Sequence, residues 1–423
     1  MTETTAGYDQ AVRQFTVGAD AASSLITLVP WTGSTHYRDE ALTMDLVFDK
    51  TIDTTYVDPE VWQVLRDAKR EFSKPGFQSA RDHVYAFSGV NSGIFSSRAA
   101  YHLASLDYAL DVTGSWSSLI PYDDKNYGVV DLAAAPGSWT EYVYYRHSRA
   151  TGVGISLISD DPMVPKWSEK LAVSAGTYTI YTGGEGDLYS QWKKFQAPLS
   201  DLVLYDGGFQ ENTEEELERQ EASHARLWTA AVSIALRTSK PGAHCVMKCF
   251  DLVSTYSAQL LYLISWAWSE VVLYKPATMR PLNAEVLVVA KGFRGSEKAR
   301  ELVDAVMRIS EMSRGLFPVR IFREALPDDF TQWLTARNDA LSLGQAEAAS
   351  VVISYMEGQG VELPKIDLVK VFIAWSIPGS VPKGRDTVIR RERAKVPMLK
   401  EGRGRGRVGR EGEARGVQVK IDK

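Results

Sequence analysis

The stretch Asp131-Leu132-Ala133-Ala134-Ala135-Pro136-Gly137-Ser138-Trp139-Thr140-Glu141-Tyr142 follows the short apolar run Val129-Val130 and leads into a segment that can be helical, 142–145. This order predicts a strand, a tight loop of small residues and a helix. Such a loop lets a ligand approach the backbone closely, and the N-terminus of the helix faces that ligand. Asp131 at the strand end can hold a ribose hydroxyl or a cationic group. The Pro-Gly-x-Trp ending favours a methyl donor over a dinucleotide as the ligand.

The bulk composition is that of a globular protein. The chain has 423 residues, 44% apolar and 24% charged, enough for two or three domains or for one core with large additions. No run of about 18 apolar residues occurs, so we expect no membrane span. Residues 1–20 show no signal-peptide pattern. Cys245 and Cys249 are the only cysteines, which fits a reducing compartment and excludes a disulfide framework. Two cysteines also leave a zinc site without enough ligands, so we expect no metal.

The charge is distributed unevenly along the chain. Residues 383–423 hold 14 Lys and Arg against 6 Asp and Glu, a net charge of +8. The whole chain has a net charge of −5, so residues 1–382 have a net charge of −13. A basic tail on an acidic body indicates a polyanionic partner, and nucleic acid fits best. A plain solvated tail is the alternative to an arm that contacts the RNA backbone.

Strand-like and helix-like segments alternate between residues 86 and 294, which is the pattern of an α/β domain. We expect strands at 128–132, 152–157, 201–205, 243–249, 270–274 and 285–290. We expect helices at 214–237, stopped by Pro241-Gly242, and at 252–268. The sequence therefore predicts a mixed sheet with intervening helices.

The flanking regions differ in character. Residues 1–85 mix short apolar pieces with helical hints and are interpreted as an N-terminal extension. Helical spacing at 297–314 and 328–355 predicts a helical C-terminal subdomain over 295–381. Residues 382–423 are rich in Arg and Gly and cannot bury a core, so we expect a disordered tail.

Four further motifs accompany the loop. They are Ser97-Arg98-Ala99-Ala100-Tyr101-His102-Leu103, then Leu204-Tyr205-Asp206-Gly207-Gly208-Phe209, then His244-Cys245-Val246-Met247-Lys248-Cys249-Phe250-Asp251, and Lys275-Pro276-Ala277-Thr278-Met279-Arg280-Pro281 leading to Asn283-Ala284-Glu285. In this order and spacing, the five motifs resemble the FtsJ-type RNA 2′-O-ribose methyltransferases. Within that group the chain is most similar to the cap-specific mRNA nucleoside-2′-O-methyltransferases. The resemblance covers roughly residues 86–294.

The resemblance implies a fold and a catalytic group. The fold is a Rossmann-like α/β methyltransferase fold, mostly parallel with an antiparallel last strand, and the site lies at the carboxyl ends of the strands. The catalytic group is a Lys-Asp-Lys-Glu tetrad around the ribose 2′-hydroxyl. Asp206, Lys248 and Glu285 match its last three members, while His102 stands where the first lysine belongs. We assign Lys248 as the base or hydroxyl-orienting group, held by the two carboxylates.

Each of these residues also has a plain structural reading. Taken singly, Lys248 fits a solvated edge lysine, Asp206 a turn cap and Glu285 an ion-pair partner of Arg280. A histidine such as His102 often serves only as a structural hydrogen-bonder. The occurrence of the residues together favours catalysis.

The resemblance also implies an S-adenosyl-L-methionine site. The loop residues expected to hold this donor are Asp131, Ala135, Pro136, Gly137 and Trp139. Gly186-Asp187-Leu188 matches a family stretch in which the aspartate contacts the adenine, which assigns Asp187 to that role.

The implied activity is methylation of the ribose 2′-hydroxyl of the first transcribed nucleotides of capped mRNA. The capped mRNA would be the partner, with backbone contacts from the basic tail and no membrane; protein partners stay unknown. Such an enzyme is intracellular, in the nucleus of a cell or in the cytoplasm or virion of a virus. One alternative is a catalytically weak or inactive cap- or RNA-binding module with the same fold, favoured by His102. The other is an active enzyme on ribosomal or transfer RNA.

His102 leads to a testable expectation. A neutral imidazole near Lys248 gives a weaker positive field than a lysine, and a weaker positive field leaves Lys248 more protonated. The pH–rate profile of methyl transfer should therefore lie at higher pH than that of a His102→Lys variant. Superimposable profiles of the two proteins would contradict this expectation.

Overall fold

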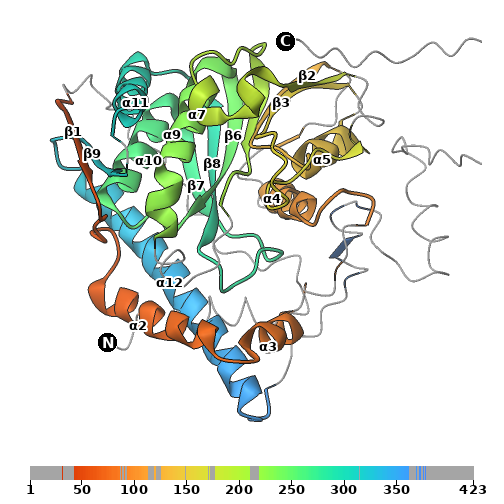
Figure 1. Ribbon diagram of the computed structural model, residues 1–423, viewed down its shortest axis with the longest axis vertical. Coiled ribbons are helices and arrows are strands. Elements are labelled where there is room, and N and C mark those ends of the chain that lie inside the picture. Colours follow the sequence, from red (N-terminus) through yellow and green to blue (C-terminus); the bar gives the residue numbers. More distant parts are fainter. Residues whose placement is uncertain are drawn as a thin grey trace, which may run out of the picture.

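The computed structural model describes Trp31, residues 42–361 with gaps at 86, 88–89, 91–92, 113–118, 121–124, 148, 170, 172–176, 210–218 and 314, and residues 368, 371–372, 375 and 377. The expected tail at 382–423 lies outside the described residues. The described part is built around one mixed sheet with helices on both faces (Figure 1). This is the α/β class that the alternating pattern predicts.

The central sheet has seven strands in the order β4-β3-β2-β5-β6-β8-β7. Pairing is parallel from β4 to β6, whereas β8 runs antiparallel to both β6 and β7. The last strand of this sheet along the chain is therefore the antiparallel one, as expected. The strands are β2 (Tyr127–Leu132), β3 (Ala150–Ile155), β4 (Tyr178–Tyr181), β5 (Ser200–Tyr205), β6 (Ser239–Phe250), β7 (Trp268–Tyr274) and β8 (Glu285–Phe293).

Six of these strands were expected, and β4 was not. The helix before Pro241-Gly242 ends earlier than expected, at Thr238, and Pro241 itself lies within β6. Pro241 stands near the start of that strand, where a missing backbone donor is tolerated.

Helices cover both faces of the sheet. The helices of the central fold are α4 (Ala99–Val112), α5 (Ser138–Arg146), α7 (Leu188–Gln191), α9 (Gln220–Thr238), α10 (Thr255–Ala267) and α11 (Glu297–Ser310). Figure 1 shows α9, α10 and α11 on one side and α4 and α5 on the other. In β6, Cys245, Met247 and Cys249 belong to the apolar cluster of α9 and α10, while Val246 belongs to that of α4 and α5. The alternation of a strand thus directs the even-numbered residue Lys248 toward α4.

The regions on either side of the central fold pack on it. A two-stranded sheet joins β1 (Met44–Asp49) antiparallel to β9 (Phe317–Phe322). The helix α12 (Asp328–Met356) matches the helical spacing, but the region expected to be helical also contains β9, which was not expected. The limits of the four proposed regions stay predictions.

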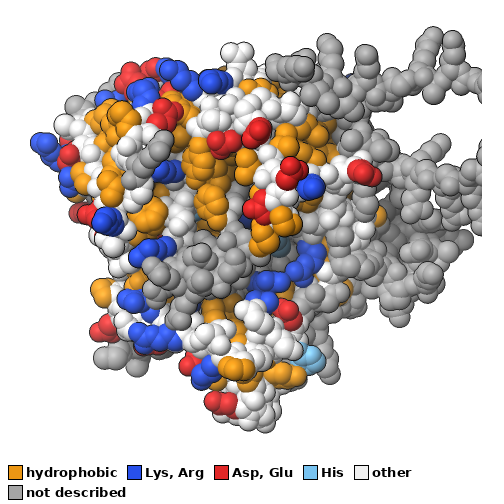
Figure 2. Space-filling view, viewed as in Figure 1, with side chains coloured by type: hydrophobic (Ala, Val, Ile, Leu, Met, Phe, Trp, Pro, Cys, Tyr) orange, Lys and Arg blue, Asp and Glu red, His pale blue; other side chains and the backbone are white. Residues whose placement is uncertain are grey.

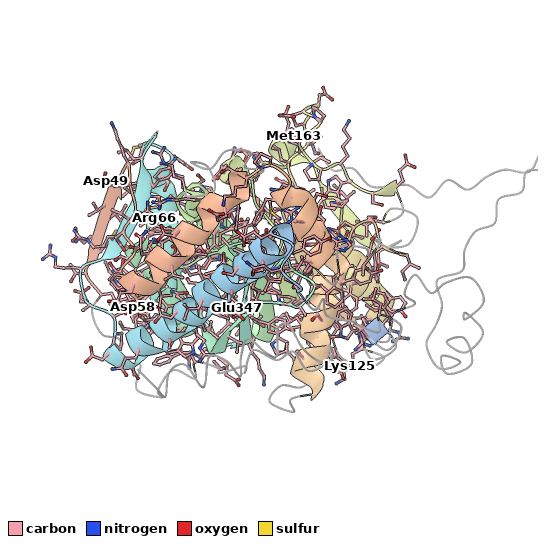
Figure 3. The ribbon with its side chains drawn as sticks, turned by 90° about the horizontal axis from the view of Figure 1, so that it is seen from below. Asp49, Asp58, Arg66, Lys125, Met163 and Glu347 are labelled. Carbon is pink, nitrogen blue, oxygen red and sulfur yellow. The ribbon has the colours of Figure 1, made fainter. Side chains whose placement is uncertain are left out.

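The long helix α12 lies beside α2 (Pro59–Arg70), the 3-10 turn η1 (Glu71–Ser73) and α3 (Phe77–Val84). Figure 3 shows Arg66 on α2 and Glu347 on α12, with Asp58 at the start of α2. The Asp58 carboxylate accepts from the backbone of Glu60 and Val61 and so caps α2. In the face seen in Figure 2, Lys and Arg side chains are frequent over this part of the molecule.

The turn that follows β6 is held by segments from both ends of the chain. Asp251 and Leu252 have positive φ angles of 52° and 88°, a strained conformation for residues other than glycine. The Asn338 amide on α12 donates to the Leu252 carbonyl at 2.9 Å and to the Tyr56 carbonyl at 2.7 Å. The Tyr56 backbone amide in turn donates to the Val253 carbonyl at 2.9 Å. The added regions therefore stabilise the turn directly after the strand that carries Lys248.

Among the described residues, no helix is both long and apolar enough to cross a membrane.

The packing of α12 leads to a stability prediction. Phe330 has no exposed surface and lies edge-on against Trp31 and Tyr262. Replacing it with alanine should lower the free energy of unfolding by about 3–5 kcal/mol, because the ring leaves a cavity. Met312→Ala, at a side chain that is 77% exposed, is the control and should change it by less than about 0.5 kcal/mol. Urea unfolding of both variants measures the difference; equal small effects would mean that α12 is not part of the core.

Candidate active site

Three of the expected catalytic residues meet at the edge of the sheet formed by the carboxyl ends of β5 and β6. Asp206 directly follows β5, Lys248 lies near the end of β6, and Glu285 is the first residue of β8. These strands are neighbours in the sheet, and β8 enters at that edge because it is antiparallel. The Lys248 Nζ lies 2.8 Å from the Asp206 Oδ1 and 3.8 Å from the Glu285 Oε1. The Lys248 side chain keeps 15% of its surface exposed, so a substrate can reach it.

The two carboxylates determine the charge of Lys248. Burial lowers the pKa of Lys248, but Asp206 and Glu285 more than offset that effect, and the pKa of Lys248 is raised. Burial raises the pKa of Glu285, while Lys248 and His102 lower it by more, so Glu285 stays ionised. In this state the site holds an ammonium group between two carboxylates.

Gly208 lies close to the Phe250 ring and to the Lys248 ammonium group. A Cβ atom on Gly208 would lie 3.2 Å from the Phe250 ring and 3.7 Å from the Lys248 Nζ. The ammonium group also lies 5.9 Å from the centre of the Phe250 ring, within cation–π range. A side chain at the second glycine of the Asp-Gly-Gly-Phe motif would therefore crowd the Phe250 ring, whereas its distance to the ammonium group would be an ordinary contact.

His102 faces the same group from α4. Its Nδ1 forms a 2.7 Å hydrogen bond with the Thr278 hydroxyl. Burial lowers the pKa of His102 to about 4, and Lys248 contributes to the same direction while Glu285 opposes it. The imidazole is therefore neutral near pH 7. Thr278 is a hydrogen-bond partner that the sequence reasoning did not single out, although it lies inside a quoted motif.

Two further residues hold Glu285 in place. The Asn283 amide donates to the Glu285 carboxylate at 3.2 Å. The buried Lys275 ammonium donates to the backbone carbonyls of Asn283 and Glu285, the latter at 3.0 Å. Burial lowers the pKa of Lys275 to about 8. Lys275 thus ties the end of β7 to the start of β8.

The expected donor loop has the predicted strand–loop–helix order. It runs from Asp131 in β2 through Ala135 and Pro136 to Gly137, directly before α5. Gly137 has a φ of 101°, which favours glycine at this position. Trp139 is 2% exposed, and its indole N–H donates to the Ala99 carbonyl at 2.9 Å. The Trp139 ring therefore fixes the loop to α4.

Asp131 is buried and incompletely paired. Its Oδ2 accepts from the Thr140 hydroxyl at 2.6 Å, whereas its Oδ1 is buried without a partner. Burial raises the pKa of Asp131 to about 7, with Asp206 acting in the same direction and Thr140 against it. A buried carboxylate oxygen without a partner is costly unless a ligand or water donates to it.

The stretch after β4 lies beside the end of β3. A Cβ on Gly186 would come within 1.9 Å of the Ser156 carbonyl oxygen, so only glycine allows this approach. The Asp187 carboxylate accepts from the backbone of Tyr189 at 3.0 Å and of Ser190 at 3.2 Å, and so caps the short helix α7. The backbone amide of Ile158 donates to the Glu185 carbonyl at 2.7 Å. This stretch and the donor loop therefore border the same edge of the sheet.

Within the described residues, no cluster of three or more His, Cys, Asp or Glu side chains is suited to hold a metal ion. Cys245 and Cys249 are both buried and unbridged.

Residues 95–293 match the family model of the FtsJ-like methyltransferases. This range includes all the quoted motifs and every expected site residue.

Curated relatives match over a longer stretch. Cap-specific mRNA (nucleoside-2'-O-)-methyltransferase 1 from Danio rerio is 26% identical over 334 residues, which cover 71% of this chain and 39% of that protein. The protein of that name from Homo sapiens is 25% identical, covering 68% and 37%, and that from Drosophila melanogaster is 27% identical, covering 59% and 34%. The chain thus spans about two fifths or less of the length of these relatives.

A solved chain from Plasmodium falciparum, described as a ribosomal RNA methyltransferase, is 18% identical and covers 48% of this chain with a TM-score of 0.32. The fold class therefore rests on the sheet topology.

The burial of Asp131 leads to a pH prediction. Its folded pKa of about 7 lies above the ordinary 3.8, so the stability that the protonated form contributes is lost as the pH rises through 7. Asp131→Asn resembles the protonated form at every pH. The stability of this variant relative to the wild type should therefore increase between pH 5 and pH 8, by about 2 kcal/mol.

Urea unfolding of the ligand-free proteins at several pH values measures this difference. A difference that stays constant from pH 5 to pH 8 would mean that Asp131 is ionised throughout.

Proposed function

We propose that residues 95–293, which match the FtsJ-like methyltransferase family model, transfer the methyl group of S-adenosyl-L-methionine to ribose 2′-hydroxyls at the first transcribed nucleotides of capped mRNA. The observation that carries this proposal is the Lys248 ammonium group, which lies between Asp206 and Glu285 and remains reachable from solvent. The three residues stand at the edge of the sheet that the donor loop also borders.

The expected donor residues fit a methyl donor with a ribose and a cationic amino-acid part. FtsJ-like methyltransferases generally use S-adenosylmethionine, which supplies an electrophilic methyl group when bound. The buried Oδ1 of Asp131 has no hydrogen-bond partner and can accept one more hydrogen bond. The loop Ala135-Pro136-Gly137 would contact the donor through its backbone. The Asp187 carboxylate would contact the adenine of the donor.

Lys248 would act on the attacking hydroxyl. Its raised pKa keeps the ammonium form at neutral pH, and that form donates a hydrogen bond that orients the 2′-hydroxyl and stabilises the negative charge growing on its oxygen. The smaller neutral fraction can accept the proton, and this fraction increases with pH. Asp206 and Glu285 fix the direction of the amine.

His102 would supply a neutral hydrogen-bonding group beside the ribose. Because its pKa is lowered to about 4, it adds no positive charge near Lys248 at neutral pH. Its bond with Thr278 leaves Nε2 as the ring nitrogen that can meet the substrate.

The choice of capped mRNA is supported by the relatives that match beyond the methyltransferase domain, all three of which carry a cap-specific name. These matches cover 59–71% of the chain and so extend beyond residues 95–293. The basic segment 383–423, with a net charge of +8, suits sequence-independent contact with the RNA backbone. Such a protein would act in the nucleus of a cell, or in the cytoplasm or virion of a virus.

A second candidate function is supported by the same histidine. A domain that binds donor and capped RNA but transfers methyl groups weakly would keep Lys248, Asp206 and Glu285 and tolerate His102. Methylation of other RNA is a third possibility, and omission of the cap from the substrate separates it from the first.

The test measures methyl transfer from labelled donor to short capped and uncapped RNA. The wild type should label capped RNA, and Lys248→Ala should reduce the rate at least about 100-fold because the hydroxyl loses its orienting group. Equal labelling of capped and uncapped RNA would mean that the protein transfers methyl groups to RNA but does not require a cap.

Lys240→Ala is the matched control. Lys240 lies in the same strand and pairs with Asp201 at 2.8 Å, the distance that also separates Lys248 and Asp206, but it stands at the opposite end of β6. This variant should retain wild-type transfer. If the wild type binds donor and capped RNA without transfer, the binding-module reading replaces the enzymatic one.

A further inference from the structure

Two buried polar side chains of α9 lie behind the catalytic residues and have no role in the chemistry above. Glu221 and His224 stand three residues apart on α9, a spacing that places them on one side of the helix. They are only 6% and 3% exposed, so neither can touch a substrate. Buried polar groups of this kind are retained where their hydrogen bonds hold other elements.

His224 holds the loop that carries Asp206. Its Nε2 bonds with the Tyr205 hydroxyl at 2.6 Å, and the nearby Gly207 backbone partly opposes the effect of burial on its pKa. Tyr205 and Gly207 flank Asp206 on both sides in the sequence. Burial lowers the pKa of His224 to about 3, so the ring is neutral, with one nitrogen donating and the other accepting.

The ring of His224 also supports Phe250. The two rings meet edge to face with centres 4.7 Å apart. Phe250 in turn packs under Gly208 and beside the Lys248 ammonium group. His224 therefore contacts both Tyr205, the residue before Asp206, and Phe250, which packs beside Lys248.

Glu221 holds the strained turn after β6. Its carboxylate accepts from the backbone amides of Val253 and Ser254 at 3.2 and 3.0 Å and from the Ser254 hydroxyl at 2.7 Å. Within this turn the Asp251 backbone amide donates to the Ala284 carbonyl at 3.0 Å, one residue before Glu285. A strained turn keeps its conformation only where surrounding contacts over-determine it.

We propose that His224 and Glu221 are positioning residues that fix Asp206, Lys248 and Glu285 relative to one another from the α9 side of the sheet. His224 sets the loop after β5, and Glu221 sets the turn after β6, which bonds through Asp251 with Ala284, the residue before β8. The proposal rests on the proposed methyl transfer for its functional consequence, but the contacts themselves can be tested without it.

The test compares two substitutions of His224. Leucine removes the hydrogen bond to Tyr205, whereas glutamine can still hydrogen-bond with the Tyr205 hydroxyl without titrating. We expect His224→Leu to lower kcat at least about tenfold, because small misplacements of catalytic groups are costly, and to leave KM for capped RNA unchanged. His224→Gln should restore most of the rate.

The pH profile provides a readout that general destabilisation does not move. Asp206 raises the pKa of Lys248, so an Asp206 displaced by His224→Leu should shift the rise of kcat with pH to lower values. Glu221→Gln, which weakens the hold on the turn, should lower kcat with KM again unchanged.

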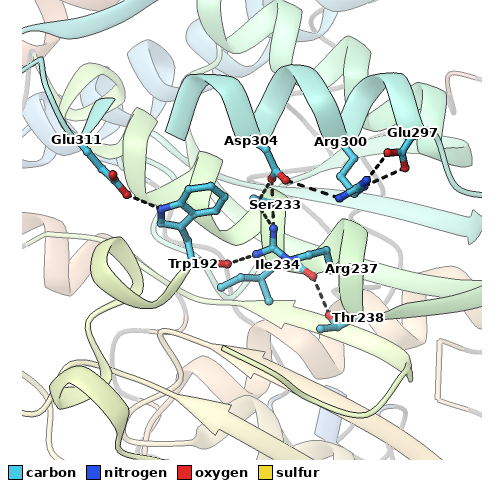
Figure 4. Close-up of polar contacts among 9 residues, drawn as sticks. All are labelled: Trp192, Ser233, Ile234, Arg237, Thr238, Glu297, Arg300, Asp304 and Glu311. Carbon is cyan, nitrogen blue, oxygen red and sulfur yellow. Dashed lines mark hydrogen bonds and ion pairs between the residues drawn. The ribbon is translucent and has the colours of Figure 1, made fainter. Parts of the chain in front are cut away.

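Ser233→Ala is the control on the same helix. Ser233 is fully buried and bonds with Asp304 and Arg237, as Figure 4 shows, but lies toward the far end of α9. It should reduce stability without moving the pH profile.

Amide hydrogen exchange at Asp206, whose backbone amide donates to the Leu132 carbonyl at 3.3 Å, supplies the readout that does not depend on methyl transfer. Exchange there should be faster in His224→Leu than in the wild type, in His224→Gln or in Ser233→Ala. If His224→Leu matches Ser233→Ala in both exchange and pH profile, the positioning role is wrong. If the wild type transfers no methyl group, the proposed function fails and exchange alone decides the positioning claim.

Discussion

A largely buried ammonium group needs anionic neighbours, and at Lys248 the fold supplies two. Asp206 at 2.8 Å and Glu285 at 3.8 Å come from strands on either side of β6. Removing either one would leave a charge with poorer compensation in a site with little water. This arrangement requires β5, β6 and β8 to be neighbours, and it requires β8 to enter the sheet antiparallel so that its first residue stands at the edge where β5 and β6 end.

The remaining structure can be understood as support for that arrangement. Gly208 allows the backbone after Asp206 to lie against Phe250, and Lys275 and Asn283 fix the start of β8. The regions outside the FtsJ-like match contribute as well, because Asn338 and Tyr56 hold the turn after β6. The electrostatics have a consequence for mechanism. The raised pKa of Lys248 keeps most of the amine as the orienting ammonium form at neutral pH, so the fraction that can accept the hydroxyl proton is small and increases with pH.

The sequence predicted the strand at 128–132 with the loop and helix after it, and the alternation of the central strands, because these features are local and periodic. It did not predict β4, which has four residues and a polar Thr179, or β9, where Pro318 and Arg320 interrupt the apolar pattern. The strand β9 depends on β1, with Met44 paired to Phe322, so no local signal defines it. The motifs indicated which residues to examine at the site, and the structure brings Asp206, Lys248 and Glu285 together; their roles stay proposals. His224 and Asn338 could not be found in this way, since each acts through distant partners, as in the bond from Asn338 to Tyr56 across 282 positions.

The most direct measurement of the central claim uses two capped RNAs that differ in one atom. One has ribose at the nucleotide next to the cap and the other has 2′-deoxyribose there, with a second pair altered at the following nucleotide. If Lys248, Asp206 and Glu285 surround a ribose 2′-hydroxyl, the wild-type protein should label the ribose form and lose that label when the methylated position is 2′-deoxy. Equal labelling of every RNA would contradict the account, because the methyl group would then be transferred to a base or to the cap.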